Sequence, residues 1–353
     1  MSDQQPLRFG ICGLGFMGRT HFAHLRQHPR AQVTAVCDRN PQLRSGQWGA
    51  PTGNMGNVPE QTADLTGVTT YADPAELIAD PQVDVVAVTL PTPCHADVSE
   101  AALRGGKHVF CEKPMALDLA GCDRMLRAAE ESGRTLMVAQ CVRFWPQYEV
   151  IYDLIAEGHI GPVRFARLAR LASPPLYSSD NWLMQGPQSG GGLLDLHVHD
   201  VDFVQHLLGL PATVFAHGRY GPSGGVDHVL ATYAYNDGAY ACIEGGWTYH
   251  APWPFEMAIT VQGEQGTLDW SSLRGELVRW YHGGKEMHAL PCPSGTGWTR
   301  EMDYFVACVE RGEPVSRCLP ASSRASIALA LLERQSIETG QPQRVDARAA
   351  GRE

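Results

Sequence analysis

A glycine-rich turn between an apolar segment and a helical segment constrains the fold of this chain more than any other feature. Gly13, Gly15 and Gly18 follow the apolar run 7–12 at the spacing Gly-x-Gly-x-x-Gly. In a strand-turn-helix unit, the first glycine permits a tight turn, the second lets the backbone approach a pyrophosphate, and the third lets the helix pack on the strand. The amino terminus of that helix attracts an anion. We therefore expect residues 13–18 to bind a dinucleotide.

An acidic residue follows the second predicted strand. Asp38 stands directly after Cys37, about 20 residues beyond the last glycine, where a carboxylate accepts hydrogen bonds from the adenosine ribose hydroxyls. A carboxylate here favours NAD, because it would repel the 2′-phosphate of NADP. Arg39 keeps NADP possible, since its guanidinium could pair with that phosphate.

The first 140 residues alternate short apolar runs with helical stretches. Strands are predicted over 7–12, 32–37, 83–90, 107–111 and 135–140, and helices over 17–28, 74–79, 95–105 and 119–132. Repeated strand-helix units of this kind form a doubly wound sheet. Residues 44–66 are rich in Gly, Pro, Asn and Thr and predict a long loop, which either closes over the adenosine end of the dinucleotide or is a disordered insertion.

The second half of the chain has a different pattern. Helices are predicted over 148–157, 193–208, 299–311 and 322–339, and strands over 163–171, 212–220, 227–235, 239–248, 255–262, 266–270 and 277–282. Asn236, Asp237 and Gly238 between two of these strands predict a hairpin. The fold class is therefore α/β, with an N-terminal doubly wound Rossmann domain (1–142) and a C-terminal α+β domain (143–353) that contains a large, mainly antiparallel open sheet.

Ligands of doubly wound sheets bind beyond the carboxyl ends of the strands. Glu112, Lys113 and Pro114 end the strand predicted over 107–111, and proline stops further pairing, so Lys113 should lie at this edge. Pro91 ends the preceding strand at the same edge. The following His95 either faces the cofactor or only caps the next helix.

A second group of polar residues follows three glycines, 190–192. Asp195, His199, Asp202 and His206 share one face of the predicted helix. His199 suits proton transfer and Asp195 could stabilise its imidazolium, although the stripe could also be a solvated outer face. Asp195-x-His197-x-His199 also matches the metal-binding string of amidohydrolases, but that chemistry requires a strand early in a barrel.

Together, four motifs resemble the Gfo/Idh/MocA family of oxidoreductases over nearly the whole chain: the Gly13–Gly18 turn, Pro91-Thr-Pro93-x-His95, Glu112-Lys113-Pro114, and Gly190-Gly-Gly192 with Asp195 and His199. The resemblance implies hydride transfer between NAD(P) and a secondary alcohol carbon of a sugar, sugar derivative or cyclitol. Some family members are NAD-dependent glycoside hydrolases, which is the alternative, and a metal-dependent hydrolase using the 195–199 string is a more remote one. A non-enzymatic NAD(P)-sensing protein is disfavoured, because the residues of the catalytic set are all present.

The resemblance also assigns the site residues. The catalytic set is Lys113, Asp195 and His199. Cofactor binding is expected at Gly13, Gly15, Phe16, Met17, Gly18, Asp38, Arg39, Pro91, His95, Glu112 and Lys113, and substrate binding at Lys113, Arg143, Trp145, Asp195 and His199, with no metal. The chain departs from the family at His197, where many members have a small residue, and in its longer 44–66 segment. Family members form dimers or tetramers through the C-terminal sheet, so a homodimer or homotetramer is expected here.

Composition limits the partners and the compartment. The formal net charge of −10 argues against a nucleic-acid partner. Ten cysteines without a Cys-x-x-Cys pattern predict buried free thiols in a reducing compartment. The first residues lack the pattern of a signal peptide and no apolar run reaches 18 residues, so we expect a cytoplasmic protein without a membrane segment.

Overall fold

The computed structural model describes residues 5–49, 52–53, 56–57, 62–284 and 287–346. They form two compact units, each built from separate segments of the chain. The first unit comprises the residues up to 139 together with 177–182 and 298–323, and the second comprises 140–176, 183–297 and 324 onward. The sequence predicts two continuous domains instead. The periodicity of the sequence does not reveal that residues 298–323 pack with the residues up to 139.

The first unit contains a six-stranded sheet in which all neighbouring strands are parallel. Its spatial order is β5-β2-β1-β6-β7-β8. The strands are β1 (Leu7–Cys12), β2 (Ala31–Cys37), β5 (Thr69–Tyr71), β6 (Val85–Val88), β7 (His108–Glu112) and β8 (Leu136–Ala139). The predicted doubly wound sheet is confirmed. The short edge strand β5 was not predicted, because three largely solvent-facing residues carry no apolar signal.

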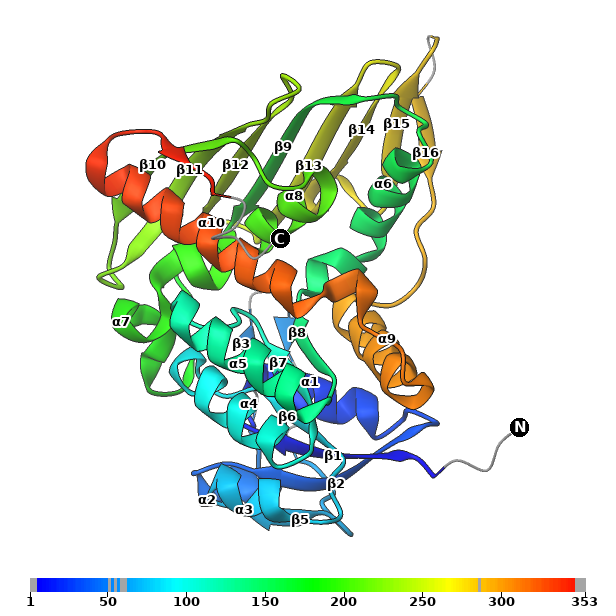
Figure 1. Ribbon diagram of the computed structural model, residues 1–353, viewed down its shortest axis with the longest axis vertical. Coiled ribbons are helices and arrows are strands. Elements are labelled where there is room, and N and C mark those ends of the chain that lie inside the picture. Colours follow the sequence, from blue (N-terminus) through cyan, green and yellow to red (C-terminus); the bar gives the residue numbers. More distant parts are fainter. Residues whose placement is uncertain (1–4, 50–51, 54–55, 58–61, 285–286, 347–353) are drawn as a thin grey trace. The chain divides into compact units, whose positions relative to one another are not determined.

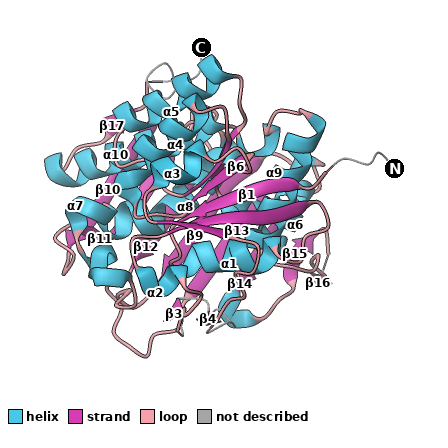
Figure 2. Ribbon diagram, turned by 90° about the horizontal axis from the view of Figure 1, so that it is seen from below, coloured by secondary structure: helices cyan, strands magenta, loops and turns pink. Residues whose placement is uncertain are grey.

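Helices cover both faces of this sheet, and alternate side chains of β1 show which helix covers which face. A Cβ at Gly10 would lie 2.6 Å from Leu77 of α3 (Pro74–Ala79), whereas Phe9 packs against Phe305 of α9 (Gly297–Arg311). Figure 2 shows α3, α4 (His95–Arg104) and α5 (Leu119–Ser132) together on one side of β1 and β6, and α1 (Phe16–Leu25) on the other. Asp73 and Asp118 cap α3 and α5 by accepting backbone N–H groups.

The segment predicted as a long loop is irregular over most of its described residues. It follows α2 (Pro41–Arg44) and contains a two-stranded antiparallel sheet of β3 (Thr52–Gly53) and β4 (Gly56–Asn57). The indole of Trp48 packs edge-on against Phe22, with ring centroids 4.9 Å apart. Residues 50–51, 54–55 and 58–61 of this prediction lie outside the described residues, and the predicted closure over the adenosine stays a prediction.

The second unit is built on a nine-stranded sheet with the order β16-β15-β14-β13-β9-β12-β11-β10-β17. All neighbouring strands are antiparallel except β9 and β12, so the predicted, mainly antiparallel sheet is confirmed. Two short edge strands, β16 and β17, were not predicted. The strands are β9 (Val163–Leu171), β10 (Thr213–Tyr220), β11 (Val226–Ala234), β12 (Tyr240–Gly246), β13 (Glu256–Gly263), β14 (Gly266–Ser271), β15 (Val278–His282), β16 (Met287–Leu290) and β17 (Gln343–Arg344).

The predicted hairpin joins β11 to β12 with the expected turn chemistry. Gly238 adopts a φ of +86°, which glycine reaches without strain, and Asp237 accepts the N–H of Ala239 at 3.0 Å. Helices α6 (Pro146–Ala156), α8 (Val198–Leu208) and the part of α10 (Pro320–Thr339) from residue 324 lie across one face of this sheet (Figure 1). No helix of the described residues is long and apolar enough to cross a membrane.

A substitution in helix α9 tests whether residues 298–323 pack with the rest of the first unit. Phe305 is fully buried and its ring contacts Phe9 and Phe110, with centroids 6.4 and 5.4 Å apart. We expect Phe305→Ala to lower the free energy of unfolding by about 3–5 kcal/mol, because it removes a large buried ring. Leu319→Ala, at a position that is 48% exposed, should change it by less than about 0.5 kcal/mol. Urea titrations of both variants would measure the difference, and equal small effects would contradict this packing.

Candidate functional site

The glycine turn between β1 and α1 has the geometry of a pyrophosphate site. Gly13 adopts a φ of +100°, and a Cβ at Gly18 would lie only 1.9 Å from the carbonyl oxygen of Gly13. Both positions therefore require glycine, one for conformation and one for close packing. A Cβ at Gly15 would meet no atom within 4 Å, so the backbone at the start of α1 faces open space that a phosphate could approach.

Asp38 is held against this turn. One carboxylate oxygen accepts the N–H of Leu14 and the other accepts the N–H of Asn40, both at 2.8 Å. A carboxylate has about four acceptor sites, so ribose hydroxyls could still donate to it. The expected position of Asp38 beside the turn is therefore observed, and its contact with the ribose stays a prediction.

Arg39 has a carboxylate partner within the first unit. Its guanidinium pairs with Asp180, and both side chains are largely exposed. Asp180 belongs to the short segment 177–182 that packs with this unit. A negative partner competes with a 2′-phosphate for the guanidinium, which favours NAD over NADP beyond the contribution of Asp38.

Two connections reach the carboxyl edge of the sheet beside the glycine turn. Lys113 follows β7 directly and is half-buried, and its peptide bond to Pro114 is cis. His95 contacts both connections: Nδ1 lies 2.8 Å from the carbonyl oxygen of Pro114, and Nε2 lies 2.8 Å from that of Leu90. Burial lowers the pKa of His95, while the two carbonyls oppose that shift.

The interpretation of His95 is corrected by these contacts. Its side chain is 1% exposed, and it neither caps α4 with a side-chain hydrogen bond nor presents a ring nitrogen outward. Both ring nitrogens instead contact backbone carbonyls of the two connections. His95 therefore contacts both connections from the interior of the unit. The sequence could not show this, because the two connections belong to separate strand-helix units.

The side chain of Glu112 also faces the interior. It is 7% exposed, and Oε1 lies 2.8 Å from Nε2 of His21 on α1. Glu301 of α9 completes a group in which one nitrogen or oxygen atom from each residue lies within 4.8 Å of the others. Neither His21 nor Glu301 was predicted as a site residue from the sequence. The one available signal was that His21 follows Gly18 by one helical turn, on a helix expected to pack against the sheet.

In the second unit, Asp195 and His199 lie on successive turns of one helical segment. A π-helical turn, Leu193–His197, carries Asp195 and leads directly into α8, which carries His199. The preceding glycines are required for packing: a Cβ at Gly192 would lie 2.8 Å from the carbonyl oxygen of Asp227 on β11. Asp227 also accepts the N–H of Gly192 at 3.3 Å, which anchors the start of the helical segment.

In the rest of the polar stripe, Asp202 is buried and His206 is partly buried. Asp202 accepts two hydrogen bonds of 2.7 Å from the guanidinium of Arg143 and one of 2.8 Å from Ser326. His206 stacks on Tyr152 at 4.4 Å. The alternative of a solvated outer face is therefore wrong, because Asp202 is buried. Its ion pair with Arg143 offsets the cost of burying the carboxylate.

Arg143 and Trp145 also differ from their expected substrate contacts. The guanidinium of Arg143 is almost fully buried in its pair with Asp202, and Trp145 is 9% exposed. Both belong to the interior of the second unit, where they pack the segment that precedes α6. Both side chains therefore have a packing role inside the second unit.

His197 is fully buried, with Nε2 located 2.9 Å from Oε2 of Glu333 on α10. Gly245 of β12 makes room for the imidazole, because a Cβ there would lie 2.4 Å from Nδ1. The Asp195-x-His197-x-His199 string lies on helical backbone rather than on a strand, so residues two apart diverge. Across the described ranges, these three side chains do not converge on one point where an ion could bind.

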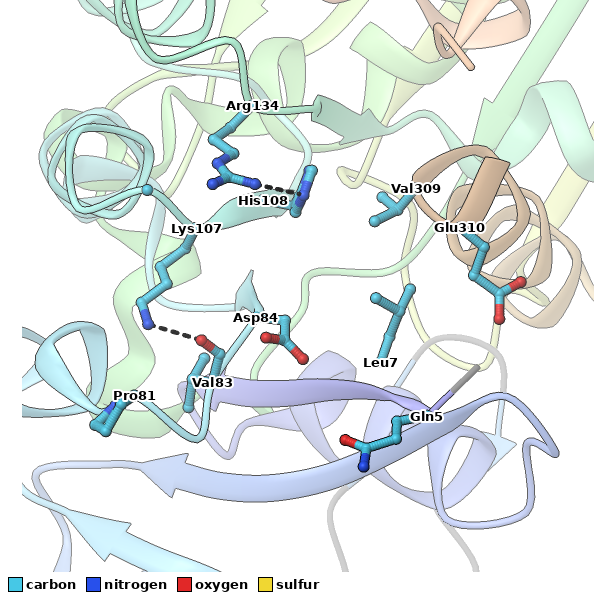
Figure 3. Close-up of a pocket in the computed structure, with 11 residues that line it drawn as sticks. Gln5, Leu7, Pro81, Val83, Asp84, Lys107, His108, Arg134, Val309 and Glu310 are labelled. Carbon is cyan, nitrogen blue, oxygen red and sulfur yellow. Dashed lines mark hydrogen bonds between the residues drawn. The ribbon is translucent and has the colours of Figure 1, made fainter. Parts of the chain in front are cut away.

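A pocket of the first unit lies at the opposite edge of the sheet. It has a volume of about 470 Å³ and opens where β1, β6, β7 and β8 begin (Figure 3). Its charged groups are bound by neighbours: Lys107 donates to the carbonyl oxygens of Asp80 and Val83, and Asp84 pairs with Arg8. Parallel sheets bind their ligands at the other edge, so this pocket is not the candidate site.

Comparisons with known proteins agree with these features. Residues 7–140 match the model of an oxidoreductase family with an NAD-binding Rossmann fold, and residues 148–269 match the GFO/IDH/MocA C-terminal domain. Myo-inositol 2-dehydrogenase of Thermotoga maritima is 28% identical over 92% of this chain and 93% of its own. The 2,7-anhydro-N-acetylneuraminate hydratase of Escherichia coli is 29% identical over 80% and 72%.

A solved structure shares the fold along nearly the whole chain. Levoglucosan dehydrogenase, in complex with NADH and levoglucosan, superimposes with a TM-score of 0.83 at 22% identity. The match covers 97% of this chain and 100% of the other. At this identity the likeness establishes the fold, and the two family models together span both units.

Asp38 tests the cofactor site. We expect Asp38→Asn to weaken NAD binding about 10–100-fold, because an amide replaces an ionised acceptor of hydrogen bonds. NADP binding should weaken less or improve, since the repulsion of the 2′-phosphate is removed. Separate fluorescence titrations with the reduced forms of NAD and NADP would measure both constants. An equal loss for the two cofactors would mean that Asp38 supports only the turn.

Proposed function

The chain belongs to the GFO/IDH/MocA family of NAD-binding oxidoreductases, and on this basis we propose that it oxidises or reduces a secondary alcohol carbon of a sugar, sugar derivative or cyclitol. The observation that carries the proposal is the shared edge of one parallel sheet. The open backbone at Gly15, the anchored Asp38 and the half-buried Lys113 all lie at that edge. This position supports the proposal that a bound cofactor would meet the ammonium of Lys113 where doubly wound sheets bind ligands.

Lys113, Asp195 and His199 supply the proton and charge handling of the proposed reaction. In the oxidative direction the substrate C–H bond breaks as a hydride, the O–H bond breaks as a proton, and a carbonyl forms. Bound NAD supplies the hydride acceptor. His199 accepts the proton, Asp195 stabilises the resulting imidazolium, and the ammonium of Lys113 stabilises negative charge that develops on the substrate oxygen.

The names of the relatives support the proposed substrate class. A relative that matches this chain over 92% of its length is a dehydrogenase of a cyclitol, and a protein of the same fold is a dehydrogenase of an anhydrosugar. These substrates share a ring with adjacent hydroxyl groups, of which one is oxidised. We infer that this chain acts on a polyhydroxylated ring of similar size.

A second candidate is chemistry without net oxidation. The relative in Escherichia coli is named as a hydratase, and addition or removal of water leaves the redox state of the substrate unchanged. Hydrolysis by an NAD-dependent glycoside hydrolase is a further reaction without net oxidation of the substrate. In such a cycle a retained NAD would accept a hydride and later return it. Product release without a change in nicotinamide absorbance would select this candidate over a dehydrogenase.

Lys113 gives the decisive test of the catalytic assignment. We expect Lys113→Ala to lower kcat by at least about 100-fold, because it removes a charge aimed at the developing alkoxide. The Kd for NAD should change less than about threefold. Lys113→Arg serves as the matched variant that keeps the charge. Near-normal turnover by the alanine variant, with cofactor still bound, would contradict the proposed role.

We also propose that the protein forms a homodimer or homotetramer through the nine-stranded sheet. Phe165, Leu230 and Tyr240 lie on the face opposite α8, and the rings of Phe165 and Tyr240 are 4.8 Å apart. Leu230 is 40% exposed and Tyr240 is 53% exposed. A second copy would remove this apolar surface from water.

Leu230 tests this assembly. We expect Leu230→Arg to weaken association by at least about tenfold, because an unpaired charge would be buried between subunits. Leu273→Arg introduces the same charge at a position that is 48% exposed outside the sheet, and should leave the assembly unchanged. Light scattering over a dilution series would measure the molecular mass. A wild-type monomer at all concentrations would exclude the proposed assembly.

Cytoplasmic localisation is part of the same proposal. All ten cysteines are free thiols, and seven of them are buried. Free thiols in these numbers are typical of proteins from a reducing compartment. NAD is itself a cofactor of cytoplasmic metabolism, which agrees with this assignment.

A further inference from the structure

Three titratable side chains from distant parts of the sequence meet inside the first unit. His21 comes from α1, Glu112 is the last residue of β7, and Glu301 comes from α9. Their exposed fractions are 1%, 7% and 0%. One nitrogen or oxygen atom of each lies within 4.8 Å of the others, and His21 Nε2 is 2.8 Å from Glu112 Oε1. We call this group the His21 cluster.

The charges of the His21 cluster do not balance if every carboxyl is ionised. The imidazole of His21 contacts Glu112, and neither carboxylate oxygen of Glu301 accepts a hydrogen bond from the described residues. The surrounding rings of Phe110 and Phe305 offer no polar hydrogen. A buried carboxylate without a donor is strongly disfavoured, whereas the neutral acid carries its own donor.

The electrostatics of the neighbouring groups favour the same form. Burial, followed by the negative charge of Glu112, raises the pKa of Glu301 well above its usual range. The other titratable groups near Glu112 are His21 on α1 and His95 on α4, with Lys113 next to it in the chain. His21 contacts Glu112, so Glu301 is left to carry the proton.

We propose that Glu301 is held as a neutral carboxylic acid beside the Glu112 carboxylate, and that the His21 cluster positions Lys113 for the reaction. The carboxyl group of Glu301 has an oxygen within 4.8 Å of one of Glu112, which also contacts His21. Glu112 is joined directly to Lys113, and His21 lies one turn after Gly18 on the helix that starts at the cofactor turn. The cluster thus ties the cofactor helix to the turn that carries Lys113.

His21, Glu112 and Glu301 are therefore positioning residues, since they act through the backbone of the turn. The positioning role rests on the proposed function of Lys113, whereas the protonation of Glu301 does not depend on any reaction. The two parts consequently fail in different experiments. A divalent cation held by the same three groups is the main rival, and the first experiment separates it from a proton.

The first experiment follows stability against pH in the wild type and in Glu301→Gln. The folded-state pKa of Glu301 is raised, so its stabilising effect is fully present below the ordinary glutamate pKa and is lost as pH rises towards the folded-state value. In that window the folded wild type holds one proton more than the unfolded chain. Its folding equilibrium constant should fall by up to about tenfold per pH unit relative to Glu301→Gln, which cannot ionise.

Glu313→Gln is the matched control, because it makes the same chemical change at an exposed carboxylate that follows α9. Its profile should run parallel to that of the wild type. Parallel profiles for wild type and Glu301→Gln would overturn the protonated state. Zinc that stabilises the wild type but not Glu301→Gln, with reversal by a chelator, would overturn it in favour of a cation.

The second experiment separates positioning from a purely structural role. Glu112→Gln should lower kcat at least about tenfold while the Kd for NAD changes less than about threefold. Glu301→Ala should also lower kcat at least tenfold, and Glu301→Gln should restore it to within about threefold of the wild type, because the amide keeps the volume and a donor. Unchanged kcat in Glu112→Gln and Glu301→Ala, with lowered thermal stability, would reduce the cluster to a structural role.

Two further outcomes are informative. If Lys113→Ala has normal turnover, the catalytic role of Lys113 fails together with the positioning role of the cluster, and the pH profile of stability still decides the protonation of Glu301. If Glu301→Gln does not fold, infrared spectra of the wild type at pH 7 replace it. A carboxylic acid carbonyl band that resists deuterium exchange supports the proposal, and loss of all such bands overturns it.

Discussion

The approach of helix α1 to the end of β1 is the constraint on which the first unit depends. At Gly18 the helix is so close that an added Cβ would lie 1.9 Å from the carbonyl oxygen of Gly13. This contact directs the open start of the helix towards the carboxyl edge of the sheet. It also fixes the next turn of α1, where His21 reaches Glu112 at 2.8 Å. One close contact thus shapes both the cofactor turn and the interior anchor of Lys113.

The second unit depends on a similarly close contact, between the helical segment 193–208 and the nine-stranded sheet. Gly192 approaches β11, and Gly245 of β12 leaves space for the ring of His197. Because the helix is buried on this scale, each charge inside it needs a partner: Arg143 binds Asp202, and Arg170 binds Asp200 at 2.8 Å. Breaking such a pair leaves one charge buried and uncompensated, which costs more than the pair itself contributes.

Much of the fold could be predicted because its signals are local. Apolar runs and glycine turns placed the main strands of the parallel sheet, and the alternating pattern placed β9 at its observed bounds. The edge strands β5, β16 and β17 were not predicted, since short exposed strands have no apolar face. The packing of α9 with the first unit was not predicted for a different reason. It depends on rings such as Phe305 and Phe9, which are remote in sequence and share no periodicity.

The candidate site divides in the same way. The glycines and Asp38 were predictable, because the backbone geometry they require is encoded within a single strand-turn-helix unit. The interior roles of Arg143, His95 and Glu301 were not, since a polar residue in a sequence does not reveal whether its partner is a ligand or another buried group. Arg143 illustrates this: its pair with Asp202 joins residues that are 59 positions apart in the sequence.

The three residues of Glu112-Lys113-Pro114 consequently have separate physical tasks. The side chain of Glu112 faces α1 and α9 on one side of the sheet, where it contacts His21. The carbonyl oxygen of Pro114 contacts His95, which begins α4 on the other side. The turn is thus held from both faces of the sheet by its outer residues. A lysine on a connection between strand and helix would ordinarily be mobile, and these two buried contacts restrict the backbone that carries it. Preorganisation of that backbone is what allows a single ammonium to stabilise charge without first being ordered by the substrate.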